Sequence, residues 1–89
     1  MSNDQTLPCS FSTLILSMAS SAVLSMGLEK NPHTGKVEKD INVARFNIDM
    51  LALLKDKTKG NLTKEEQDFL DMVVSDLQMK FVSVTQGAT

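Results

Sequence analysis

A stop signal and a start signal for α-helices lie next to each other in Lys57-Thr58-Lys59-Gly60-Asn61-Leu62-Thr63-Lys64-Glu65-Glu66. The lysines suit the negative carboxyl end of a helix, and Gly60 suits the left-handed residue that often follows one. Thr63 and Glu66 have the spacing of a capping box, in which each side chain accepts a hydrogen bond from the other residue's amide. One helix should therefore end and another begin across a very short turn, which predicts an antiparallel helical hairpin.

Apolar residues recur with helical spacing throughout the chain, and no long run alternates with period two. Three helices are expected, over about residues 11–26, 41–58 and 64–82. Ser10 or Ser12 can cap the first helix and Gly27 can end it, while Asp40 can cap the second. The predicted fold class is all-α, with the last two helices as the hairpin and homo-oligomer packing completing the core.

The length allows only one small domain, because the chain has 89 residues and a mass of 9.8 kDa. We expect this domain to span residues 10–84. A flexible amino-terminal tail at 1–9 and a carboxyl-terminal tail at 85–89 should flank it.

The net charge and the cysteine content restrict the classes of partner and the cellular compartment that we expect for this protein. A net charge of -2 leaves no basic field to neutralise phosphates, so no nucleic-acid binding is expected. The single Cys9 cannot form an internal disulfide, which favours a cytoplasmic protein. The uncharged stretch from Phe11 to Leu28 approaches the length of a membrane span, but its serines and its lack of flanking aromatic and basic residues argue against a membrane location.

The first helix has two contrasting faces. Its expected core face consists of Phe11, Ile15, Leu16, Met18, Ala19, Ala22, Val23 and Met26. The opposite face has no charge and combines Leu14 and Leu24 with hydroxyl side chains. Small residues with the spacing of Ser17, Ser21 and Ser25 allow another backbone to approach closely. We interpret this face as packed against a second molecule, and a weakly polar face in water is the alternative.

The other two helices also carry more apolar surface than one core requires. The second helix has Ile41, Ala44, Ile48, Leu51 and Ala52 on one side and Val43, Phe46, Met50, Leu53 and Leu54 on the other. Beside its main stripe, the third helix has a thinner one of Phe69, Met72 and Met79. Leaving about four large side chains in water forgoes ~1.5–3 kcal/mol each. We therefore expect a homodimer or higher oligomer, with contacts through Leu14, Ser17, Ser21, Leu24, Ser25, Phe46, Met50 and Leu53.

No pattern in the sequence indicates catalysis, so no catalytic, cofactor-binding or metal-ligating residue and no cofactor is expected. His33, in the turn Asn31–Gly35, is a weak candidate for a loop site. One histidine and the distant Cys9 are too few ligands for a typical zinc site.

Two functions follow from these patterns. The first is a homo-oligomeric interaction or structural module without catalysis of its own, whose partner is itself or possibly another protein. The alternative is a small-molecule-binding or enzymatic protein with an apolar pocket at the oligomer interface, lined by Met and Phe and approached by His33. A binding site should show an apolar cavity with converging polar groups, whereas an assembly module should show a filled seam.

Several strings in the chain resemble a known family. They are Phe11-Ser12-Thr13, Ser20-Ser21-Ala22, Asn31-Pro32-His33-Thr34-Gly35, Ile48-Asp49-Met50-Leu51, Lys57-Thr58-Lys59-Gly60-Asn61-Leu62-Thr63 and Glu65-Glu66. From about Phe11 to Val82 the chain is similar to the short bacterial proteins grouped as domain of unknown function 1844. The resemblance implies a bacterial, cytoplasmic, helical protein. It implies no activity, substrate or catalytic residue.

Overall fold

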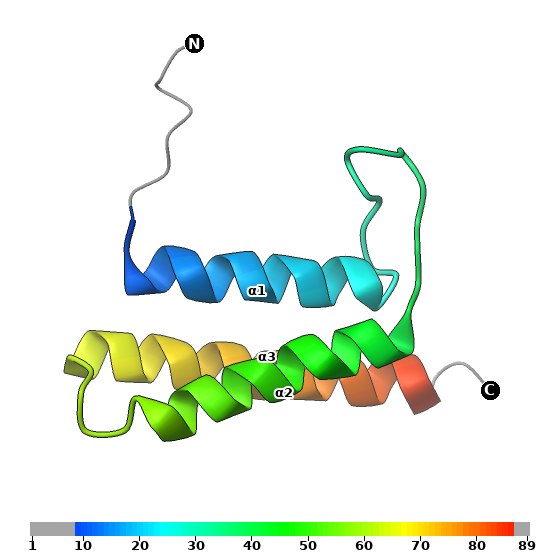
Figure 1. The fold of residues 1–89 in the computed structure, drawn as a ribbon. Helices are drawn as coiled ribbons and strands as arrows, with labels where there is room; N and C mark the ends of the chain where they lie inside the picture. Colours follow the sequence, from blue (N-terminus) through cyan, green and yellow to red (C-terminus); the bar gives the residue numbers. More distant parts are fainter. Residues whose placement is uncertain (1–8, 87–89) are drawn as a thin grey trace, which may run out of the picture.

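The structure is a computed structural model that describes residues 9–86. These residues form three helices, α1 (Phe11–Ser25), α2 (Ile41–Lys57) and α3 (Lys64–Gln86), and no strand. Each helix packs against the other two, and α1 lies across the hairpin of α2 and α3 (Figure 1). Helices α1 and α3 run in the same direction and α2 runs against both. The predicted all-α class and the antiparallel hairpin are confirmed.

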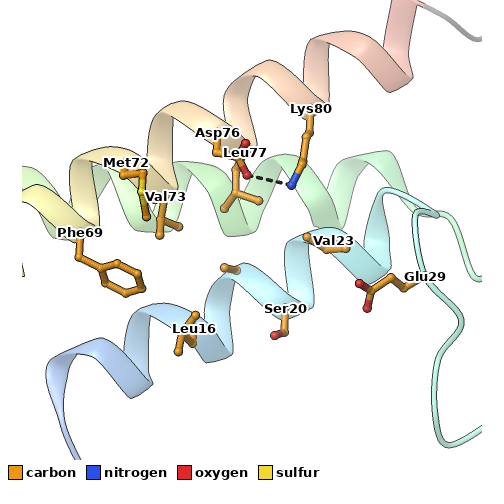
Figure 2. A pocket seen from close by; sticks show the side chains of 11 residues that line it. Leu16, Ser20, Val23, Glu29, Phe69, Met72, Val73, Asp76, Leu77 and Lys80 are labelled. Carbon is orange, nitrogen blue, oxygen red and sulfur yellow. Dashed lines mark hydrogen bonds and ion pairs between the residues drawn. The ribbon is translucent and has the colours of Figure 1, made fainter.

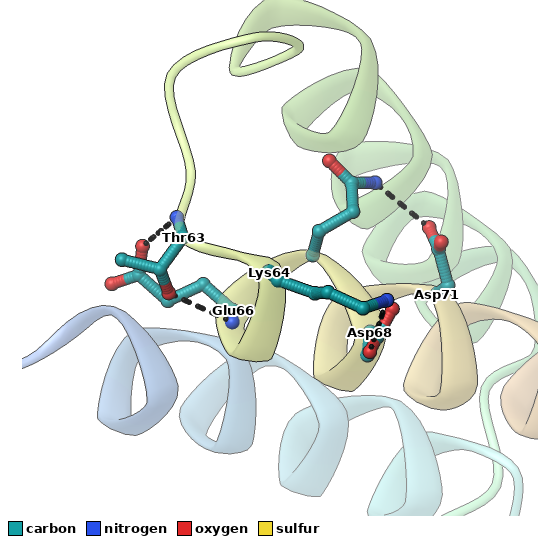
Figure 3. Close-up of polar contacts among 6 residues, drawn as sticks. Thr63, Lys64, Glu66, Asp68 and Asp71 are labelled. Atoms are coloured by element: carbon teal, nitrogen blue, oxygen red, sulfur yellow. Dashed lines mark hydrogen bonds and ion pairs between the residues drawn. The ribbon is translucent and has the colours of Figure 1, made fainter.

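The turn between α2 and α3 has the predicted capping geometry (Figure 3). The Thr63 hydroxyl accepts a hydrogen bond from the Glu66 amide at 3.1 Å, and the Glu66 carboxylate accepts one from the Thr63 amide at 2.9 Å. Gly60 has a φ of 83°, in the left-handed region where a side chain would be strained. These local interactions fix where α3 begins and turn the chain back along α2.

The main difference from the expected boundaries is at the end of α3, which continues to Gln86 rather than stopping near Val82. Thr85 and Gln86, expected in the carboxyl-terminal tail, are therefore helical. Nothing between Val82 and Gln86 is a helix breaker, and the Thr85 hydroxyl donates to the Phe81 carbonyl at 2.9 Å. Of the other expected tail residues, Cys9 is described and is exposed outside α1, and 1–8 and 87–89 lie outside the described residues.

Smaller differences occur at the ends of α1 and α2. Met26 and Thr58, expected to be the last helical residues, are instead the C-caps. Ser10 is the N-cap of α1, and Asp40 is the N-cap of α2 with its carboxylate accepting from the Val43 amide at 3.2 Å. The start of each helix is thus set by a side chain that satisfies a free amide in the first turn.

The core lies where the three helices meet. It consists of Ile15, Ala22 and Met26, of Ala44, Ile48 and Leu51, and of Leu70, Val73, Val74 and Leu77. Leu16 was expected on the core face, but it is 52% exposed. Successive helical residues point about 100° apart, so with Ile15 fully buried, Leu16 lies at the edge of the contact with α3. The assignment of Leu16 to the core was wrong.

Removing the cap of α3 should destabilise the fold. Thr63→Ala deletes the hydroxyl that accepts from Glu66, and we expect a loss of about 1 kcal/mol in the free energy of unfolding. Thermal or denaturant unfolding followed by circular dichroism measures this loss. Thr63→Ser is the matched control, because it keeps the hydroxyl and should stay close to the parent protein. An unchanged unfolding curve for Thr63→Ala would contradict a role for this cap in stability.

Candidate functional site

Five large apolar side chains are exposed along α2 and the adjoining edge of α1. We call them the α1/α2 surface: Leu14, Val43, Phe46, Met50 and Leu53. Phe46 is 61% exposed and Leu53 is 50% exposed. Leu14, Met50 and Leu53 line one hollow between the two helices. Val43 and Phe46 continue the same side of α2 toward its amino end, so the five residues form one continuous apolar area.

The predicted contact residues on the serine-containing face of α1 differ in their exposure to solvent. Ser17 is exposed, whereas Ser21, Leu24 and Ser25 are half-buried. The Ser21 hydroxyl accepts a hydrogen bond from the Asn47 side-chain amide of α2 at 3.2 Å. The close neighbour at Ser21 is therefore α2 of the same chain. Contact between the predicted residues and a second molecule stays a prediction.

A groove with a volume of about 440 Å³ runs between α1 and α3, on the other side of α1 (Figure 2). We call it the α1/α3 groove. Its apolar walls are Leu16, Ala19, Val23, Phe69, Met72, Val73 and Leu77. Met72 at the rim is 59% exposed. Figure 2 shows Glu29 and the ion pair of Asp76 and Lys80, 2.8 Å long, toward one end of the groove.

The sequence anticipated part of this groove but not its position. Phe69 and Met72 belong to the thin apolar stripe expected on α3, and both line the groove, whereas Met79 lies in a separate hollow on the outer side of α3. His33 and the predicted oligomer contacts do not line it. The residue that the sequence analysis misassigned is Leu16, which it placed on the core face and which lines the groove instead.

His33 lies in an exposed turn that is closed by its own hydrogen bonds. The Asn31 side-chain carbonyl accepts from the His33 amide at 2.8 Å, and the Asn31 side-chain amide donates to Glu38 at 3.0 Å. Gly35 has a φ of 72°, and its amide donates to the Asn31 carbonyl at 2.7 Å. These contacts hold the turn together.

Side chains that could bind a metal ion do not gather within residues 9–86. No three or more His, Cys, Asp and Glu side chains in this range are placed to hold a metal ion. Cys9 is exposed before α1. None of the helices in the described part of the chain combines the length and the apolar character needed to cross a membrane.

Two of the lysines near the hairpin turn are paired with acids. Lys64 contacts Asp68 at 3.2 Å, and Lys55 contacts Asp71 at 3.1 Å across the gap between α2 and α3. The Gln67 side-chain amide also donates a hydrogen bond to Asp71, at 3.1 Å. The hydrogen bond from Lys55, aided by that from Gln67 and by the lysine charge, lowers the pKa of Asp71 below its ordinary value of 3.8, against a smaller effect of desolvation.

Fold and surfaces together define a small all-α protein in which one helix packs on a helical hairpin and two apolar surfaces are exposed on the single chain. The chain belongs to the family described as Domain of unknown function (DUF1844), whose family model matches residues 8–83. The resemblance seen in the sequence is thereby confirmed. Comparisons with curated proteins and with solved structures found no match to this chain.

The contact between Lys55 and Asp71 should be visible in the titration of Asp71. Because the folded pKa of Asp71 is lowered, its contribution to stability is present above pH 3.8 and is lost as the pH falls through the folded pKa. Lys55→Met removes the main cause, so the pKa of Asp71, measured by NMR, should rise toward 3.8. Lys64→Met, which breaks the pair with Asp68 instead, should leave it unchanged. An Asp71 pKa that is insensitive to Lys55→Met would contradict this assignment.

Proposed function

We propose that this protein is a homo-oligomeric helical interaction module that assembles through the α1/α2 surface and has no catalysis of its own. One observation carries the proposal: five large apolar side chains adjoin one another on that surface and are exposed in the single chain. Large connected apolar areas of this kind are typical of association sites in soluble proteins.

The free energy at stake is large for a chain of this size. Burying a large apolar side chain is worth roughly 1.5–3 kcal/mol, so five that are about half exposed forgo on the order of 5 kcal/mol. The total stability of a protein domain is about 5–15 kcal/mol. Association that covers the α1/α2 surface would therefore recover free energy comparable with the stability of the fold itself.

A second copy is the simplest occupant of this surface. Every copy presents the same apolar area, so self-association needs no other gene product and is the commonest form of assembly in soluble proteins. The composition of the area also suits an interface, because Phe and Met are enriched at protein contacts and Met adapts its shape to a partner.

Placing a charge in the middle of the α1/α2 surface should break the assembly. We expect the parent protein to sediment as an oligomer and Phe46→Glu to sediment as single 9.8 kDa chains, because burying an unpaired carboxylate is costly. Helicity by circular dichroism should be retained, since Phe46 is mostly exposed in the single chain.

Ser75→Glu is the matched control, because it adds the same charge at an exposed position on α3. It should sediment like the parent protein. The proposal fails if the parent protein is a single chain at micromolar concentration, or if Phe46→Glu assembles as the parent does.

A further inference from the structure

We infer that the α1/α2 surface of one copy packs into the α1/α3 groove of the next copy, so that the protein assembles head to tail. This inference rests on the proposed self-association and adds the identity of the opposing surface. Three observations support it. The two surfaces have the same length, and the charges at their ends are opposite. In addition, packing of the α1/α2 surface against itself would leave the apolar groove exposed.

Within the α1/α2 surface, Phe46, Met50 and Leu53 form a ridge along α2. Extended to Lys57, this ridge has the same length as the groove. Along the ridge, Phe46, Met50 and Leu53 are followed one turn later by Lys57. Along α3, the residues that line the groove begin at Phe69 and end at Lys80. In both cases the ends lie eleven residues apart on one helix, which is about 16 Å. An amphipathic helix with anchors at this spacing is the usual occupant of an apolar groove between helices.

The charges at the ends of the two surfaces are opposite. Lys57 lines the hollow at the α1/α2 surface, is exposed, and forms no ion pair with a described residue. Glu29 lines the groove, is exposed, and likewise has no charged partner in residues 9–86. Asp76 and Lys80 neutralise each other beside it, so this end of the groove has one net negative charge. A helix seated with Phe46 toward Phe69 brings its Lys57 to Glu29.

Packing of the α1/α2 surface against itself would leave the groove empty. Leu16 and Met72 would then stay more than half exposed, next to the half-buried Phe69. A head-to-tail contact covers both apolar surfaces in one interface. Since each copy would use two different surfaces, the assembly grows until it closes into a ring or continues as a filament.

Two variants that each lose one surface test this arrangement. Phe46→Glu blocks the ridge and leaves the groove intact, whereas Leu16→Glu blocks the groove and leaves the ridge intact. Both side chains are more than half exposed, so both variants should fold, which circular dichroism checks. We expect each variant alone to be a single chain. Mixed in equal amounts, they should form a dimer of twice the 9.8 kDa mass that grows no further.

The outcomes separate this inference from the proposed function. If Phe46→Glu dissociates the protein but Leu16→Glu assembles like the parent, the α1/α2 surface packs against the same surface of another copy, and the head-to-tail inference is wrong. If the two dissociated variants do not pair on mixing, the groove has another occupant, such as an apolar ligand or a different protein, and the inference is also wrong. If Phe46→Glu assembles like the parent, both the inference and the proposed function fail. Met72→Glu should repeat the behaviour of Leu16→Glu.

A charge exchange tests the orientation of the ridge. Glu29→Lys and Lys57→Glu should each weaken assembly roughly three- to tenfold at low salt, because each places like charges opposite one another across the contact. The double variant, with both substitutions in every copy, should recover most of that loss. Lys59→Glu is the matched control, since Lys59 is exposed near the same helix end but does not line the α1/α2 hollow. Failure of the double variant to recover would overturn the proposed pairing.

Discussion

A single helix can cover only one face of a helical hairpin. The short turn around Gly60 holds α2 and α3 antiparallel, and α1 is the only other helix in residues 9–86 that can pack on them. The core therefore forms where α1 meets the hairpin, and the side of α2 that carries Phe46 and Leu53 is exposed in the single chain. Apolar surface is left exposed on the single chain because the helices are apolar over more of their circumference than contacts among three helices can bury.

Features fixed by neighbouring residues could be predicted from the sequence. The capping box of Thr63 and Glu66, the N-cap of Asp40 and the left-handed Gly60 each depend on atoms within three or four positions along the chain. The end of α3 was placed too early because no residue there forces a stop, and a helix without a stop signal continues as long as its backbone is satisfied.

Features that depend on the rotation of α1 against the hairpin could not be predicted in the same way. A projection shows which residues share a face, but not where the centre of that face lies relative to two neighbouring helices. Ile15 and Ala22 lie at the centre of the contact between α1 and the hairpin. In this orientation Leu16 lies at the edge near α3, and Ser21 contacts Asn47 of α2. The groove and the division of the serine face both result from this rotation. The exposed ridge of α2 was easier to predict, because its apolar residues surround most of that helix in any rotation.

Apolar contact and charge have different roles in a head-to-tail assembly. In the proposed assembly most of the free energy would come from burying Phe46, Met50 and Leu53, but residues at this spacing would fit almost as well after sliding by one turn, about 5.4 Å. In the proposed contact Lys57 would meet Glu29 in only one of these registers, because a slip of one turn would add about 5.4 Å to their separation, which is more than the length of an ion pair. A single exposed pair contributes little affinity, yet it is enough to favour one register among several of similar apolar burial. In the proposed assembly the uncharged ridge would thus make association favourable, while the charges at its end would make it specific.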